Sequence, residues 1–135
     1  AQVVTKQITL PQDISNVTFK LTSAGMGGST CDVYVQTTDD GGTTWYDLGH
    51  FTQVGTTAIS NANAQWMTIP VDGTATTGLG NGYTGSVAAS TFTVSRVSGL
   101  PILNKLVQIA FVYAGSNTSN AGVTVKAYGA QAARV

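Results

Sequence analysis

The chain has few of the side chains on which catalysis, metal binding and nucleic-acid recognition depend. Only 9% of its 135 residues are charged, it has one histidine and one cysteine, and glutamate is absent. Six basic and six acidic residues give a net charge of +0, whereas nucleic-acid binding draws on lysines and arginines that neutralise phosphates. We therefore expect no nucleic-acid partner.

Long apolar runs are also missing. No stretch approaches the roughly 18 apolar residues that cross a bilayer, so we expect no membrane association. The first residues lack the basic and apolar regions of a secretory signal. Cys31 has no second cysteine to pair with, and at the start of an apolar strand a free thiol behaves as a small hydrophobic side chain.

What the chain does have is a strand-forming pattern. Hydrophobic residues make up 42% of the sequence, and they alternate with threonine, serine, asparagine and glutamine, as in half-buried strands. The alternation predicts about eight strands. After a first strand that ends at Pro11, they cover residues 16–23, 32–38, 43–51, 65–71, 90–98, 104–114 and 122–130.

Three of these segments carry further information. In residues 16–23, Val17, Phe19 and Leu21 fall on one face, which predicts an inward-facing row. Pro70 predicts that 65–71 ends there or lies at a sheet edge, because proline has no amide hydrogen to donate. Residues 104–114 are apolar on both faces, which predicts a central position in a sheet.

Short strands joined by turns, without helical periodicity, predict an all-β fold: an antiparallel two-sheet β-sandwich of jelly-roll or immunoglobulin-like type. We expect a single domain over residues 1–135 with a long loop at 72–90. That loop has little to pack, so contacts from a neighbouring subunit are the expected means of ordering it. A homo-oligomer follows from this reasoning.

The titratable residues do not suggest an enzyme. His50 has no cysteine, glutamate or second histidine at metal-ligand spacing, and a surface or strand-end position is expected for it. Four aspartates surround one hairpin, but their spacing matches no calcium loop; they are Asp32, Asp39, Asp40 and Asp47. The glycine-rich runs match no phosphate-binding motif. We expect no catalytic residue, no metal and no cofactor.

The strongest local motif is TDDGGTTW at residues 38–45. It resembles the Asp-box of sialidase-like propellers, Ser/Thr-x-Asp-x-Gly-x-Thr-Trp, at its defined positions Thr38, Asp40, Gly42, Thr44 and Trp45. Asp40 is expected to accept amide hydrogens across the turn, Gly42 to take a positive φ, and Trp45 to fold over the hairpin. A propeller needs several such boxes, so the motif predicts a structural hairpin without glycosidase activity.

The wider segment 32–53 carries a second resemblance. A Val-x-Val-Gln strand leads through Asp-Gly-Gly-Thr-Thr-Trp to an aspartate and then to Phe-Thr-Gln. This pattern is similar to that of small structural proteins of tailed bacteriophages, in particular capsid decoration, or cement, proteins. Residues 106–113 also suit that family, whereas the loop 72–90 and residues 128–135 have no counterpart in it.

The resemblance implies a decoration protein that binds the outer lattice of the major capsid protein and stabilises it. Such a protein is made in the cytoplasm of the bacterial host and located on the virion surface, and a trimer is the favoured oligomer. One alternative is a tail or neck component of the same virion. Another is a carbohydrate-binding module that presents aromatic side chains as a stacking platform, the candidates being Trp45, Tyr46, Trp66 and Tyr83.

Overall fold

The structure is a computed structural model, and it describes residues 2–71, 95–96, 102–115 and 122–131. Apart from one short 3-10 helix, Asn61–Asn63, its regular elements are strands. They are β1 (Gln2–Thr9), β2 (Ile14–Ser23), β3 (Ser29–Thr37), β4 (Tyr46–His50), β5 (Gln65–Pro70), β6 (Ser95–Arg96), β7 (Leu106–Gly115) and β8 (Val123–Gln131). The described residues contain no helix long and apolar enough to span a bilayer.

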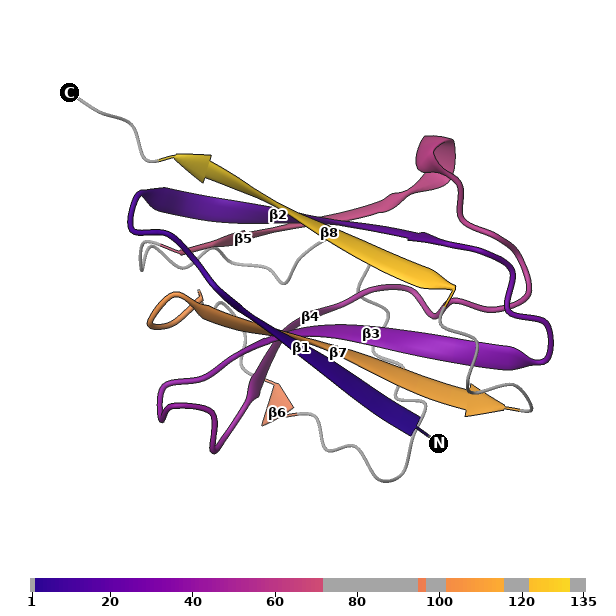
Figure 1. Cartoon of the computed structure of the whole chain (residues 1–135), viewed down its shortest axis with the longest axis horizontal. Helices are drawn as coiled ribbons and strands as arrows, with labels where there is room; N and C mark the ends of the chain where they lie inside the picture. The colour runs from indigo at the N-terminus through magenta and orange to yellow at the C-terminus, as the bar shows by residue number, and fades with distance from the viewer. Residues whose placement is uncertain (1, 72–94, 97–101, 116–121, 132–135) are drawn as a thin grey trace.

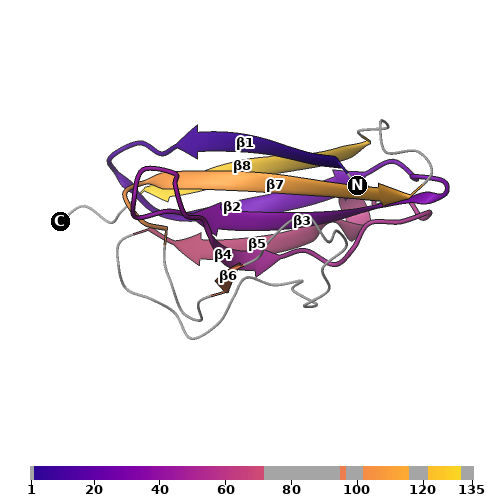
Figure 2. The same cartoon turned by 90° about the horizontal axis from the view of Figure 1, so that it is seen from below.

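Within the described residues, the strands form a five-stranded sheet in the order β1-β7-β3-β4-β6 and a three-stranded sheet in the order β5-β2-β8. Figure 1 shows the three-stranded sheet above the five-stranded one, and Figure 2 shows the same layers from below. Neighbouring strands are antiparallel, except that the two-residue β6 runs parallel to β4. The predicted all-β, two-sheet sandwich is confirmed.

The strand order bears on the choice between jelly-roll and immunoglobulin-like topology. Strands β5-β2 and β7-β3 occupy the places of the E-B and F-C pairs of an immunoglobulin domain. The edge places are exchanged, however, because β8 lies beside β2, where the first immunoglobulin strand belongs, and β1 lies beside β7, where the last belongs. The sandwich is therefore immunoglobulin-like in its centre, with its first and last described strands transposed.

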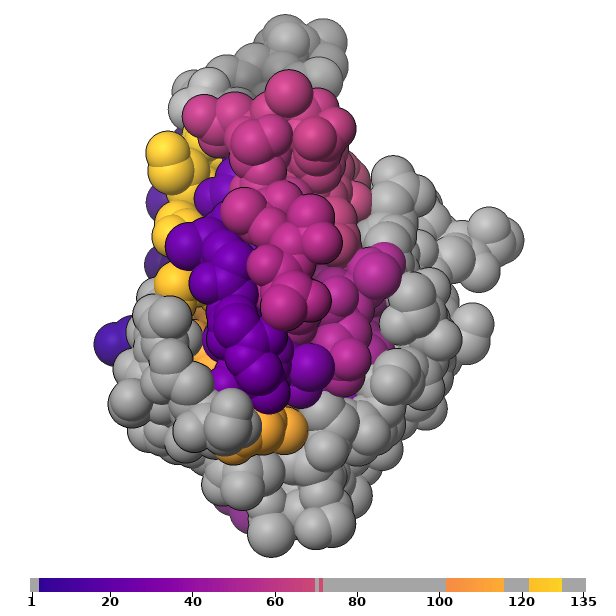
Figure 3. Space-filling view, turned by 90° about the vertical axis from the view of Figure 1, so that its right-hand side faces the viewer, coloured from indigo at the N-terminus to yellow at the C-terminus, as the bar shows by residue number. Residues whose placement is uncertain are grey.

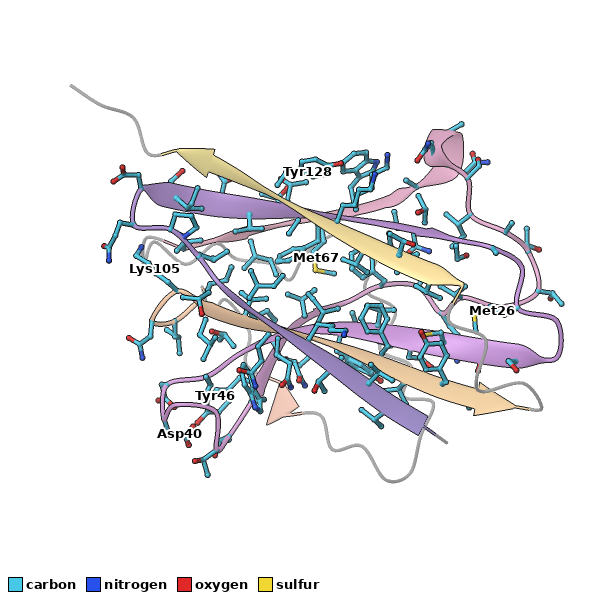
Figure 4. The ribbon with its side chains drawn as sticks, viewed as in Figure 1. Met26, Asp40, Tyr46, Met67, Lys105 and Tyr128 are labelled. Carbon is cyan, nitrogen blue, oxygen red and sulfur yellow. The ribbon has the colours of Figure 1, made fainter. Side chains whose placement is uncertain are left out.

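The core lies between the two sheets and follows the predicted alternation. Val17, Phe19 and Leu21 of β2 are at most 1% exposed, and they face buried side chains of β3 and β7. Met67 of β5 also points into this layer, as Figure 4 shows. Burying these side chains removes apolar surface from water, at roughly 25 cal/mol per Å², and this holds the sheets together.

Strand positions also agree with the sequence-based expectations. β7 lies between β1 and β3, which confirms the central place predicted for residues 104–114. β5 is an edge strand that ends at Pro70, as the proline predicts. Several strand ends differ from the expected ones. β2 begins at Ile14 rather than at residue 16, and β3 begins at Ser29 rather than at residue 32. β4 begins at Tyr46 rather than at residue 43, because the amides of Thr43 and Thr44 bond to Asp40 instead of to a neighbouring strand.

One end of the sandwich is formed by two irregular segments, residues 24–28 and 51–64, which lie side by side in Figure 3. The amide of Met26 donates to the carbonyl of Gly55, and Ser23 and Ile59 exchange two backbone hydrogen bonds. Met26 is 1% exposed and packs into the core at this end. The predicted long loop, residues 72–90, lies outside the described residues.

Candidate functional site

The hairpin at residues 38–45 connects β3 to β4 at the end of the five-stranded sheet opposite Met26 (Figure 4). Thr38 organises its first half. The Thr38 hydroxyl donates to Asp40 Oδ1 over 2.8 Å, and it accepts the amide hydrogens of Asp40 and Gly42 over 3.3 and 3.1 Å. The hydroxyl of this buried threonine therefore satisfies backbone amides that have no neighbouring strand to bond to.

Asp40 closes the second half of the turn. Its Oδ1 accepts the amide hydrogens of Thr43 and Thr44 over 3.1 and 2.9 Å. These donors favour the ionised carboxylate, and they lower the pKa of Asp40 from 3.8 to about 2, with the Thr44 amide as the largest cause and the Thr38 hydroxyl next. Asp40 takes the amide-acceptor role expected from the Asp-box motif.

Gly42 and Trp45 complete the motif. Gly42 has a φ of 105°, which residues with a side chain rarely adopt. A Cβ built on Gly42 would lie 3.5 Å from Cζ2 of Trp45, so the indole ring lies against this glycine. Thr38, Asp40, Gly42, Thr44 and Trp45 thus form a turn whose polar groups bond to one another, and its chemistry is that of a structural cap.

A second polar group lies on the face of the five-stranded sheet that points away from the core. His50 Nε2 lies 2.9 Å from Asp32 Oδ1, and Gln53 Nε2 donates to Asp32 Oδ2 over 2.8 Å. Asp32 and His50 are both 0% exposed. Tyr34 lies between them in sequence and opposite His50 in register, and its ring stacks on the imidazole.

Burial dominates the chemistry of this Asp32–His50 cluster. It raises the pKa of Tyr34, and the carboxylates of Asp32 and Asp47 raise it further. Beside them, Gln108 Nε2 donates to Gln36 Oε1 over 3.0 Å across β7 and β3. A histidine held by an aspartate also occurs in catalytic triads, but here neither side chain reaches the surface.

The expectation for His50 was therefore partly wrong. His50 is the last residue of β4, but it is buried rather than on the surface. The four aspartates considered for calcium do not converge either: Asp32 pairs with His50, Asp39 and Asp40 lie in the exposed turn, and Asp47 is buried in β4. Among the described residues, no three His, Cys, Asp or Glu side chains form a group suited to a metal ion.

Cys31 lies on the opposite, core-facing side of β3 and is 0% exposed. Burial, and after it the nearby carboxylate of Asp32, raises the pKa of its thiol from 9.0 to about 12. Its register partner on β7 is Tyr113, whose pKa burial likewise raises to about 12. The expected role of Cys31 as a small hydrophobic core residue matches this environment.

The aromatic residues proposed for sugar stacking occupy different environments. Trp45 is half-buried against Gly42, Tyr46 is half-buried in β4, and Tyr83 lies outside the described residues. Trp66 is exposed at 46%. Tyr128 on β8 is exposed at 48%, and the sequence reasoning missed it. Its exposure could have been predicted, because Thr124, Lys126 and Tyr128 alternate in the sequence with the apolar Val123 and Val125.

Comparison of the chain with protein-family models, curated proteins and solved structures finds no match. The similarity to tailed-phage structural proteins therefore depends on the sequence motifs alone.

Proposed function

We propose that this chain is a non-enzymatic structural component of a tailed-bacteriophage virion, and that it acts as a capsid decoration protein on the lattice of the major capsid protein. The observation that carries the proposal is the hairpin at residues 38–45, which is held by hydrogen bonds among its own residues. It lies within the segment that resembles phage decoration proteins, and its polar groups are engaged in holding its own shape.

The state of the titratable side chains supports a role without catalysis. The carboxylate of Asp40 accepts three hydrogen bonds within the hairpin, and a pKa of about 2 makes it a poor base. His50 and Asp32 are sealed from solvent. General acid-base catalysis requires groups that reach the substrate, and Asp32 and His50 are enclosed by other protein atoms.

The edge of the five-stranded sheet supports association with other chains. β1 is eight residues long, and Lys6 is its one charged residue. Edge strands of this kind expose backbone groups that pair readily with another chain, since charges are the usual protection against pairing. Val3 on this strand is 37% exposed. Many copies, each with a modest interface, would then strengthen a shell through multivalency.

Co-sedimentation tests the proposal. Heads of the encoding phage, prepared without this protein, are mixed with fluorescently labelled chain and pelleted. We expect saturable binding at a stoichiometry proportional to the capsid lattice, together with a higher temperature of head disruption. Excess unlabelled chain should displace the label, which controls for trapping in the pellet. A chain that stays in the supernatant would contradict the decoration role.

The same assay separates decoration from a tail or neck role. A neck or tail component would bind complete tails, or the single portal vertex, and would saturate at one ring per particle. Light scattering after size-exclusion chromatography adds the oligomeric state. We expect an oligomer, with a trimer favoured because it suits a lattice site of threefold symmetry.

A carbohydrate-binding module is the second candidate, and the exposure of Trp66 and Tyr128 favours it. Exposed aromatic rings on a sheet are suited to stacking against sugar rings. A strict monomer that binds glycans and ignores phage heads would support this candidate over decoration.

A further inference from the structure

The outer face of the three-stranded sheet carries an unusual set of side chains. Core-facing residues alternate with outward-facing ones along each strand, so the neighbours of buried Phe19 and Met67 point outward. We call this the Trp66–Tyr128 face, formed by Thr18, Lys20, Trp66, Thr68, Lys126 and Tyr128. Figure 4 shows Tyr128 on the side of the sheet away from the core, whereas Met67 lies between the sheets.

Two large aromatic side chains flank the central strand of this face. Trp66 lies opposite Lys20 in the β2–β5 pairing, and Tyr128 lies opposite Thr18 in the β2–β8 pairing. From the usual strand spacing and rise per residue, their Cα atoms lie roughly 12 Å apart. Trp66 and Tyr128 are 46% and 48% exposed, so both residues are available to a ligand that extends across the sheet.

Hydroxyl and ammonium groups fill the space between the rings. Thr18 and Thr68 share a hydrogen bond of 2.9 Å between their hydroxyls across β2 and β5, and a hydroxyl has capacity for more than one bond. Lys20 Nζ lies 5.2 Å from the centroid of the Trp66 ring, within the range of a cation–π interaction. Lys20 therefore places a hydrogen-bond donor over the Trp66 ring.

The charge on this face has one sign. Lys20 and Lys126 are direct cross-strand partners, an arrangement that is destabilising for like charges. No acidic residue occurs in β2, β5 or β8, so these strands supply no carboxylate to offset the pair. An anionic group bound between the two ammonium groups would relieve this repulsion.

The chemistry of the face favours a sugar chain over other polymers. Protein interfaces are depleted of lysine at their centres, whereas here Lys20 lies on the central strand of the face and Lys126 lies opposite it on β8. Single-stranded nucleic acid also stacks on aromatic rings, but its affinity depends on a groove rich in basic residues, and these three strands hold only Lys20 and Lys126. Sugars present C–H faces to rings and hydroxyls to threonines.

The geometry points to the Trp66–Tyr128 face as a binding site for an acidic polysaccharide, with sugar rings stacked on Trp66 and Tyr128 and their carboxylates between Lys20 and Lys126. This inference deepens the carbohydrate-binding candidate, which uses the same two side chains, and it is independent of the virion role, because a decoration protein and a free module would both be able to use such a face. Its test is a glycan titration, which is separate from the co-sedimentation assay.

Calorimetric titration of the full chain with a galacturonic-acid hexamer tests the site, with cellohexaose as a neutral probe and a ten-residue oligothymidylate as a nucleic-acid probe. We expect the acidic hexamer to bind with a Kd below about 1 mM and to weaken as salt is raised. Equal or tighter binding of either other probe would overturn the assignment. So would no binding of the acidic hexamer.

Variants locate the binding. Trp66→Ala and Tyr128→Ala should each weaken binding of the acidic hexamer about tenfold, while Tyr128→Phe should keep most of the affinity because the ring remains. Lys126→Gln should reduce affinity and its salt dependence. Lys6→Gln, a matched loss of charge on β1, should change neither. Folding of every variant is checked by its Tm, and unchanged binding in both alanine variants would place the site elsewhere.

Discussion

The ring of Tyr34 stacks on the ring of His50, with centroids 4.2 Å apart and planes 13° apart. The two residues are register partners on β3 and β4. Asp32, which lies two residues before Tyr34 on the same face of β3, is hydrogen-bonded to the imidazole. The stack and the Asp32–His50 hydrogen bond together order the outward side of the five-stranded sheet, which is as well buried at these residues as the core.

Breaking the Asp32–His50 pair should be costly. Asp32→Ala or His50→Ala is expected to lower the free energy of unfolding by about 3–5 kcal/mol, because each leaves the other polar group buried without this partner. The measurement is urea denaturation followed by tryptophan fluorescence.

The double variant Asp32→Leu/His50→Leu should lose less than the sum of the two single variants, since no polar group of the pair then remains buried. Asp39→Ala in the exposed turn is the control and should change stability by less than about 0.5 kcal/mol. Single variants as stable as the wild type would show that the pair contributes little.

Asp40 should matter more than its neighbour Asp39, although both are exposed turn aspartates. Asp40→Ala removes the acceptor of the Thr43 and Thr44 amides, so a lower Tm and faster amide exchange at these two residues are expected. Asp39→Ala should leave the exchange rates unchanged. Equal exchange in the two variants would argue against the capping role of Asp40.

The same carboxylate predicts a pH dependence of stability. The pKa of Asp40 is lowered from 3.8 to about 2 on folding, so its stabilising contribution is complete above the unfolded value and is lost as pH falls through the folded one. The difference in Tm between the wild type and Asp40→Asn should stay constant above about pH 5 and shrink between about pH 4 and pH 2. A difference that grows on acidification would contradict this sign.

Gly115 should be among the least replaceable glycines. Its φ is 109°, and a Cβ there would lie 2.5 Å from the carbonyl oxygen of Gly28. Gly115→Ala is expected to destabilise the fold by at least about 2 kcal/mol through strain and overlap. Gly55→Ala is the matched control, because its Cβ would meet nothing within 4 Å. Similar urea midpoints for the two variants would contradict the prediction.

Cys31 should be unreactive in the folded protein. With a thiol pKa of about 12 and no exposed surface, it holds almost no thiolate at pH 8, and the thiolate is the reactive form. We expect no reaction with Ellman's reagent under native conditions and full reaction in denaturant. Rapid labelling of the native protein would show that β3 opens locally.

Local patterns predicted the strands well because buried apolar residues alternate with exposed polar ones along a single strand. The inward row of β2 and the central position of β7 both follow from the sequence of a single segment. The motif at residues 38–45 was predictable for a similar reason, since its bonds join residues at most four positions apart.

The Asp32–His50 cluster was not predictable in this way. It depends on the register of β3 and β4, which contains an irregularity between Val35 and Gln36, and on burial of a sheet face whose residues are largely polar. The same limit applies to the Trp66–Tyr128 face. Trp66 and Tyr128 come together only because both strands pair with β2, and no local pattern specifies that pairing.

The transposed edge strands have a consequence for how the chain acquires its fold. β1 pairs with β7, and β2 pairs with β8 as well as with β5, with Thr9 opposite Leu106 and Ser23 opposite Val123. Contacts of such high sequence separation carry a large loop-closure entropy and slow the folding of small domains. During synthesis, β1 and β2 leave the ribosome before β7 and β8, so neither sheet can be completed until these later strands have emerged.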